Sequence, residues 1–149
     1  MQPSDTNKPD HAASVLRVID ANLNRLREAL RVVEEYARFL TGDEELAVRL
    51  KGMRHALRQV EERVGQKQLL RSRDTAGDPL SSGNRPEELN RTGAAGVVRA
   101  NLKRGQEAAR VLEEYTKVAD MPGAADTAKA LRFGLYEVEK QLLGQDMDG

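Results

Sequence analysis

Several residue types that often carry protein chemistry are absent or rare in this chain of 149 residues. Cysteine is absent, which excludes disulfides, thiolate nucleophiles and cysteine-based zinc sites. His11 and His55 are the only histidines, too few for a histidine-rich metal site. Aromatic residues make up 3%, and 24 Lys and Arg residues balance 24 Asp and Glu residues. The low aromatic content and the zero net charge argue against nucleic acid as a partner.

Long apolar runs are absent as well. No segment approaches the roughly 18 consecutive apolar residues of a membrane-spanning helix, so we expect no membrane partner. Residues 1–9 are polar and lack the apolar stretch of a signal peptide. We therefore expect residues 1–9 to be a disordered tail, residues 145–149 to be a second tail, and the protein to be cytoplasmic.

Helical periodicity dominates the rest of the chain. Apolar residues recur at spacings of three and four, which predicts helices over residues 10–40, 44–70, 92–118 and 124–143. On a helical wheel the apolar face of the first helix is centred near Val15, Val33 and Leu40. Gly42 suits the left-handed conformation that ends a helix, and Asp43 is the expected N-cap of the next one.

An internal repeat is the most informative feature of the sequence. Residues 22–36 align with residues 101–115 at an offset of 79, and ten of the fifteen positions are identical. The partner helices align at an offset of 78, a difference that we attribute to hairpin turns of unequal length. Two helical hairpins in tandem predict an all-α four-helix bundle with pseudo-two-fold symmetry.

This duplication defines the expected domain organisation. We expect one helical domain over residues 10–144, in which repeat 1 covers 10–70 and repeat 2 covers 92–144. Residues 71–91 lack periodicity and are rich in Gly, Pro, Asp and Ser, so they are expected to form a long loop between the halves. Leftover apolar edges of such a bundle also allow a homodimer.

Two repeated Asn–Arg pairs lie at the boundary of the apolar face. They are Asn22 with Arg25, and Asn101 with Arg104. One interpretation is structural: each amide binds a backbone carbonyl and each arginine extends to solvent along the edge of the face. The other is a polar pocket where the hairpins meet, because guanidinium groups bind phosphate oxygens well.

A second repeated set lies on the opposite side of the helices: Glu28, Arg31 and Glu35, and again Glu107, Arg110 and Glu114. Such spacing is typical of ion pairs that support any exposed helix. The alternative is functional, because carboxylates beside arginines can hold Mg²⁺ next to phosphates.

Further candidates lie in the segment 71–78, at the start of the expected loop 71–91. This segment places Arg71, Arg73, Asp74 and Asp78 around a glycine, which is typical of an ordinary turn capped by aspartate side chains. The functional alternative is a lid that brings Arg and Asp to a charged ligand. Lys51 and His55 share one face of the second helix, where a lone histidine is more often structural than catalytic.

The chain resembles the small monofunctional hydroxymethylpyrimidine phosphate kinases of bacterial thiamine biosynthesis, a domain often fused ahead of thiamine phosphate synthase. The resemblance covers about residues 12 to 143 and rests on segments in the same order: 19–25, Glu28, 30–31, 34–39, 73–75, Asp78, 100–104, 107–108 and 110–115. It implies transfer of the ATP γ-phosphate to 4-amino-5-hydroxymethyl-2-methylpyrimidine phosphate, which gives the diphosphate. ATP and Mg²⁺ are the implied cofactors.

The residue roles that we assign follow from this chemistry. The acceptor is a phosphate oxygen that is already anionic at pH 7, so positioning and charge neutralisation matter more than a general base. The candidates for catalysis are Arg25, Arg104, Arg73 and Asp74. The candidates for substrate binding are Asn22, Asn101, Arg31, Arg110, Lys51 and His55. The candidates for Mg²⁺ are Glu28, Glu107, Asp74 and Asp78.

Two other functions remain open at this point. One is a non-catalytic helical module that binds or docks on an enzyme of the thiamine pathway. The other is a metal-independent all-helical enzyme that acts on a small dianion. Only the kinase requires binding of ATP with Mg²⁺.

Overall fold

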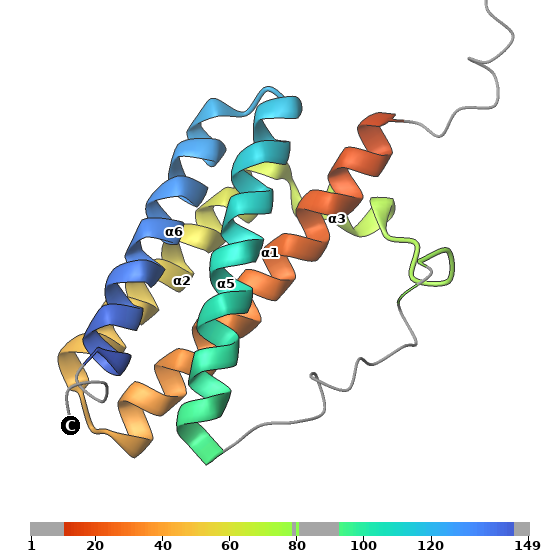
Figure 1. Ribbon diagram of the computed structural model, residues 1–149. Coiled ribbons are helices and arrows are strands. Elements are labelled where there is room, and N and C mark those ends of the chain that lie inside the picture. Colours follow the sequence, from red (N-terminus) through yellow and green to blue (C-terminus); the bar gives the residue numbers. More distant parts are fainter. Residues whose placement is uncertain (1–10, 79, 81–92, 145–149) are drawn as a thin grey trace, which may run out of the picture.

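The computed structural model of the chain describes residues 11–78, 80 and 93–144 (Figure 1). Its elements are α1 (His11–Glu35), the π-helical turn η2 (Tyr36–Leu40), α2 (Glu44–Val64), α3 (Gln66–Ser72), α5 (Gly93–Val118) and α6 (Pro122–Leu143). This described part of the chain is all-α, as predicted, with no strand. Both expected tails, and residues 79 and 81–92 of the expected loop, lie outside it.

The four long helices form the predicted bundle. The helices α1 and α5 pack side by side in opposite directions, and each also packs on its own hairpin partner, α2 or α6 (Figure 1). The core is continuous across the halves and includes Leu26 and Leu30 of α1, Leu102 of α5 and Leu135 of α6. Full burial of each leucine contributes about 1.5–3 kcal/mol, so this shared face accounts for much of the stability.

One glycine sets how closely the helices approach. A Cβ atom at Gly105 of α5 would lie 3.0 Å from Leu135 Cδ1 of α6 and 3.3 Å from Ala29 Cβ of α1. Real Cβ contacts are rarely this short. The absence of a side chain at Gly105 therefore lets α5 pack tightly against both neighbours.

The same buried ion pair recurs in each hairpin. Arg54 of α2 donates from Nε and Nη2 to Glu34 of α1, at 2.5 and 3.0 Å. At the equivalent positions Arg132 of α6 donates to Glu113 of α5, at 3.2 and 2.9 Å. Both carboxylates are buried. The repeat therefore preserves an internal polar clamp as well as the apolar face.

The turns of the two hairpins correct our explanation of the changed offset. They are equally long and match at an offset of 78, since Gly42 and Asp120 are equivalent and have positive φ values of 66° and 58°. The extra residue of the first hairpin lies in η2, where Thr41 N–H donates to Tyr36 O five residues back, at 3.1 Å. A π-helical turn holds one residue more than an α-helical turn, so it absorbs the insertion.

The π-helical turn also overturns one prediction of the helical wheel. Leu40, which was placed at the centre of the apolar face, is 60% exposed, and the neighbouring Phe39 is exposed too. The wheel assumes about 100° per residue throughout. That assumption fails within the π-helical turn, because the wider turn shifts the phase of the residues that follow. Ala37 is still buried, whereas Phe39 and Leu40 are exposed.

Other helix boundaries agree closely with prediction. Asp43 is the N-cap of α2, as expected, because its Oδ1 accepts from Leu46 N–H at 3.1 Å. The predicted helix 44–70, however, breaks at Gly65, which has a φ of 98°. The helix α3 that follows turns back onto α1 and extends two residues into the predicted loop.

No helix in the described ranges combines the length and the apolar character needed to cross a membrane.

Candidate functional site

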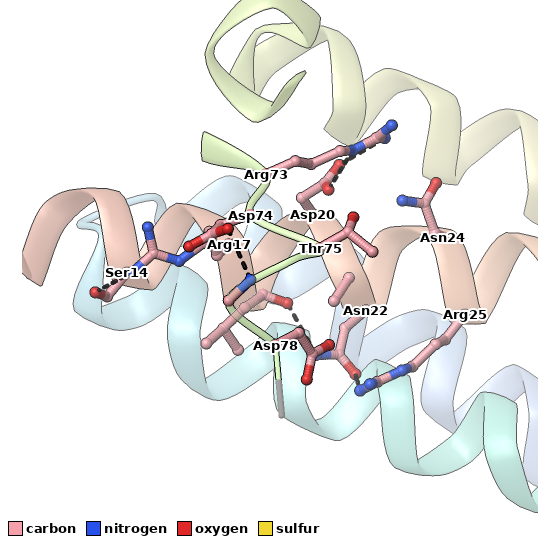
Figure 2. Close-up of a pocket in the computed structure, with 13 residues that line it drawn as sticks. Ser14, Arg17, Asp20, Asn22, Asn24, Arg25, Arg73, Asp74, Thr75 and Asp78 are labelled. Carbon is pink, nitrogen blue, oxygen red and sulfur yellow. Dashed lines mark hydrogen bonds and ion pairs between the residues drawn. The ribbon is translucent and has the colours of Figure 1, made fainter. Parts of the chain in front are cut away.

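A cavity of about 640 Å³ lies where the segment 73–78 crosses the first half of α1 (Figure 2). This segment follows α3, whose packing on α1 places it there. Polar side chains dominate the described lining of the cavity, which consists of Ser14, Arg17, Val18, Asp20, Ala21, Asn22, Asn24, Arg25, Arg73, Asp74, Thr75, Gly77 and Asp78. The structure thus brings together Asn22, Arg25, Arg73, Asp74 and Asp78 of the residues proposed from sequence.

The buried amide of Asn22 forms hydrogen bonds with both the backbone of α1 and an arginine that lines the cavity. Its Nδ2 donates to Val18 O at 2.9 Å, and its Oδ1 accepts from Arg25 Nη1 at 3.5 Å. Asn101 makes the equivalent bond to Val97 O at 2.8 Å. The structural interpretation of these amides, that each binds a carbonyl, therefore applies in both halves. In the first half the amide oxygen additionally orients an arginine of the cavity (Figure 2).

An ion pair between Arg73 and Asp20 holds the segment 73–78 against α1. Arg73 donates from Nε and Nη2 to the two carboxylate oxygens of Asp20, at 2.7 and 3.0 Å (Figure 2). Asp20 is only 6% exposed. The hydrogen bonds from Arg73 to Asp20 and the charge of Asp20 raise the pKa of Arg73 further above its usual range. This bidentate geometry is the strong form of an arginine–carboxylate contact.

Asp20 is a site residue that sequence reasoning missed. A comparison of the two halves would have pointed to Asp20, because the residue at its position differs between them. Arg99 stands where Asp20 would be in the second half, and Lys103 stands where Asn24 would be. Of these paired positions, only position 20 in the first half carries a carboxylate that can accept hydrogen bonds from Arg73.

Asp74 and Asp78 both cap turns, as the structural interpretation expected. Asp74 Oδ1 accepts from Gly77 N–H, and Asp78 Oδ1 accepts from Leu80 N–H, each at 2.9 Å. Each carboxylate has a second oxygen, and Mg²⁺ is usually held by one or two carboxylates together with substrate phosphates. No three acidic or histidine side chains in the described ranges gather as a metal cage. The donor set therefore fits a cation that is bound mainly by phosphates.

The remaining candidates do not line this cavity: Glu28, Arg31, Lys51, His55, Asn101, Arg104, Glu107 and Arg110. All but Asn101 are exposed. Arg31 lies 3.9 Å from Glu35, and Arg110 lies 3.4 Å from Glu114. These are the helix-supporting ion pairs of the structural interpretation. The cavity lies between the first half and the segment 73–78, and of the two Asn–Arg pairs only Asn22 and Arg25 are among its described lining residues.

Comparison with known proteins gives a consistent family assignment. A protein called thiamine-phosphate synthase in Parasynechococcus marenigrum is 44% identical over 125 residues, which cover 84% of this chain and 34% of that protein. Proteins of the same name in Nostoc punctiforme and Gloeobacter violaceus are 39% and 44% identical, over 87% and 89% of this chain.

The match covers only part of each relative. This chain spans about a third of the length of these curated relatives, between 34% and 38% in the three described. No solved structure matches. The model of the ThiD2 family matches residues 17–141, which include most of α1, nearly all of both hairpins and every described cavity residue except Ser14. The chain therefore belongs to the ThiD2 family.

Proposed function

We propose that this chain is a helical domain of thiamine biosynthesis that is associated with thiamine-phosphate synthase. Its cavity binds 4-amino-5-hydroxymethyl-2-methylpyrimidine phosphate. The observation that carries this proposal is the convergence of Arg17, Arg25 and Arg73 on one cavity of about 640 Å³. The names of the relatives support the pathway, and the resemblance described above supports the ligand.

The three arginines differ in how they are held. Arg73 is fixed by Asp20, and Arg17 donates to Ser14 Oγ at 2.8 Å. Within the part of the chain that the structure describes, Arg25 makes a single long hydrogen bond of 3.5 Å, to Asn22 Oδ1. A guanidinium has five N–H groups, and the contact of Arg25 with Asn22 uses one of them. Arg25 is therefore the residue best suited to grip a ligand phosphate, with Arg17 as a second contact.

A finer proposal is that the domain is also a kinase. In this reaction an oxygen of the bound monophosphate attacks the γ-phosphorus of ATP, a new O–P bond forms, and the bond to the β-phosphate oxygen breaks to leave ADP. The acceptor oxygen carries no proton at pH 7, so the arginines need only position and neutralise charge. Asp74 and Asp78 would hold Mg²⁺ together with the phosphates, and the bound ion would supply further charge neutralisation.

The binding proposal is tested by titration calorimetry with the pyrimidine monophosphate. Arg25→Lys keeps the charge but loses the forked donor geometry, so affinity should fall at least about tenfold, or about 1.4 kcal/mol. Arg58→Lys on the exposed face of α2 is the matched control and should bind like wild type. Equal affinity of wild type and Arg25→Lys, or no binding by wild type, would contradict the proposal.

The kinase proposal needs a separate assay of ADP release with ATP and Mg²⁺. We expect ADP with the monophosphate as acceptor and little with the free alcohol, which lacks the group that the arginines bind. Tight binding of the monophosphate without ADP release would support the binding proposal and refute the kinase proposal.

The predicted homodimer and cytoplasmic location stay predictions.

A further inference from the structure

A second cavity adjoins the first on the other side of the Arg73–Asp20 ion pair. Its volume is about 240 Å³. Asp20, Asn24 and Arg73 line both cavities, so these three residues form a common wall. The remaining described lining of the second cavity comes from Leu23 and Arg27 of α1, Glu61 of α2, and α3.

The chemistry of the second cavity differs from that of the first. Three leucines give it apolar surface: Leu23 and Leu69 are buried, and Leu70 lies at the rim with 62% exposure. Of its two arginines, Arg73 pairs with Asp20, and Arg27 forms an ion pair with Glu61 and also donates to Asn24. The cavity therefore offers apolar walls and a neutralised charge pair, which suit an uncharged group.

Two amides add a directional feature. Asn24 lies in the common wall, and Gln66 lies on α3 at the edge of the second cavity. An amide presents a donor and an acceptor side by side, but Asn24 Oδ1 already accepts from Arg27, so Gln66 is the better candidate for such a paired contact. The edge of an aminopyrimidine presents the complementary pair, an amino group that donates and a ring nitrogen that accepts, as adenine does to asparagine or glutamine.

We propose that the second cavity holds the ring of a ligand whose phosphate lies in the first cavity. This inference rests on the proposed function and adds where the two parts of its ligand lie, with the flat heteroaromatic ring in the second cavity and the phosphorylated side arm in the first. Leu23, Leu69 and Leu70 contact the ring faces, and the amide of Gln66 forms hydrogen bonds with its edge. The combined volume is within the range typical of small-molecule sites, about 300–1,000 Å³.

The common wall has a defined part in this arrangement. Arg73 and Asp20 lie where the ring and the phosphate arm join, so Asp20 is a positioning residue. It holds the guanidinium of Arg73 at the junction through two hydrogen bonds. A ligand that fills both cavities contacts this pair from both sides, whereas inorganic phosphates contact it from one side.

The test compares two probes, the pyrimidine monophosphate and inorganic pyrophosphate, by titration calorimetry. Leu70→Trp fills the second cavity from its rim, so it should weaken the pyrimidine monophosphate at least about tenfold and pyrophosphate by less than about twofold. Gln66→Ala removes one amide and should weaken the pyrimidine monophosphate about three- to tenfold. Val48→Trp is the matched control on α2, because Val48 is also apolar and is 66% exposed; it should bind both probes like wild type.

The outcomes separate this inference from the proposed function. If wild type, Leu70→Trp and Gln66→Ala bind the pyrimidine monophosphate equally, the ring assignment is wrong and the proposed function stands. If Leu70→Trp weakens both probes alike, the second cavity is not specific for the ring, and the inference is again overturned. If wild type does not bind the pyrimidine monophosphate, the proposed function fails and the inference falls with it. Unchanged melting temperatures confirm that the variants fold.

Discussion

At the scale of single residues, three buried carboxylates on the two central helices have different tasks. Glu34 and Glu113 each accept two hydrogen bonds from an arginine of the same hairpin, Arg54 or Arg132. Asp20 instead accepts from Arg73, which lies outside the hairpin helices. The first two carboxylates therefore clamp the bundle, and the third places a segment of the candidate site.

The clamp predicts how stability depends on pH. Burial raises the pKa of Glu113, but the hydrogen bond from Arg132 and the charges of Arg132, Lys117 and Arg110 lower it by more, so the net pKa is below its ordinary value. A carboxyl group with a lowered pKa stabilises the fold above its unfolded pKa, about 4.3, and loses that contribution as the pH falls through its folded pKa. Wild type should therefore lose stability on the acid side.

Glu113→Gln tests this dependence by urea unfolding at pH 7, 5 and 3.5. At pH 7 the variant should be less stable by about 3 kcal/mol, because it leaves a mostly buried arginine without its counter-ion. Between pH 7 and pH 3.5 its unfolding free energy should fall less than that of wild type. Glu114→Gln, at an exposed neighbouring position, should stay within about 0.5 kcal/mol of wild type. Parallel pH curves for wild type and Glu113→Gln would refute the assignment.

Sequence reasoning identified part of the candidate site. Asn22, Arg25, Arg73, Asp74 and Asp78 line the cavity because three of them follow α3 and two share one face of α1. Repetition in both halves did not by itself indicate a site residue, since exposed ion pairs recur in the two halves just as the core residues do. Asp20 escaped notice because its importance depends on Arg73, which lies 53 positions further along the chain.

At the scale of elements, helix type and order were predictable, but two local departures were not. The helical period continues past Gly65, so nothing in the apolar spacing marks the break between α2 and α3. The extra residue of the π-helical turn η2 changes the repeat offset from 79 to 78, but this change does not show where in the hairpin the residue lies. The position of the cavity depends on the first of these departures, since α3 delivers the segment 73–78.

Two glycines in the bundle should respond in opposite ways to substitution. Gly105→Leu forces a side chain against Leu135 and Ala29 and should destabilise the fold by about 1–3 kcal/mol. Gly52→Ala on α2 has no atom within 4 Å of the added Cβ and should stabilise the helix by about 0.5–1 kcal/mol. Differential scanning calorimetry measures both. A Gly105→Leu variant that melts no lower than wild type would show that the helices are not closely packed there.

At the scale of the whole molecule, the two hairpins share one core. The apolar faces of α1 and α5 pack on each other, so neither hairpin can unfold without exposing the buried face of the other. The duplication made this architecture predictable, because each hairpin has an equivalent apolar face and the two faces can bury each other. The position of the candidate site was not predictable in the same way. Symmetry suggests an equivalent cavity in each half, whereas the two adjoining cavities described above lie on the first half and the segment that follows it.

The shared core predicts one cooperative unfolding transition. The chain has no tryptophan, so one can be placed at equivalent positions of the two halves by Tyr36→Trp or Tyr115→Trp. Urea titrations followed by fluorescence should give the same midpoint for both variants, within the error of the fit, and agree with circular dichroism. Two separated midpoints, or a plateau between them, would mean that the hairpins unfold independently.

The place of the π-helical turn also bears on how the first hairpin tolerates its extra residue. An inserted residue in a helix acts like a frameshift, because every later side chain rotates relative to the core until the helix ends. Here the shift begins after Val33, Glu34 and the cavity-lining residues of α1, and the helix ends five residues later. The insertion displaces Phe39 and Leu40 to the surface. The side chains before it keep their orientation relative to the core, and the cavity depends on that orientation.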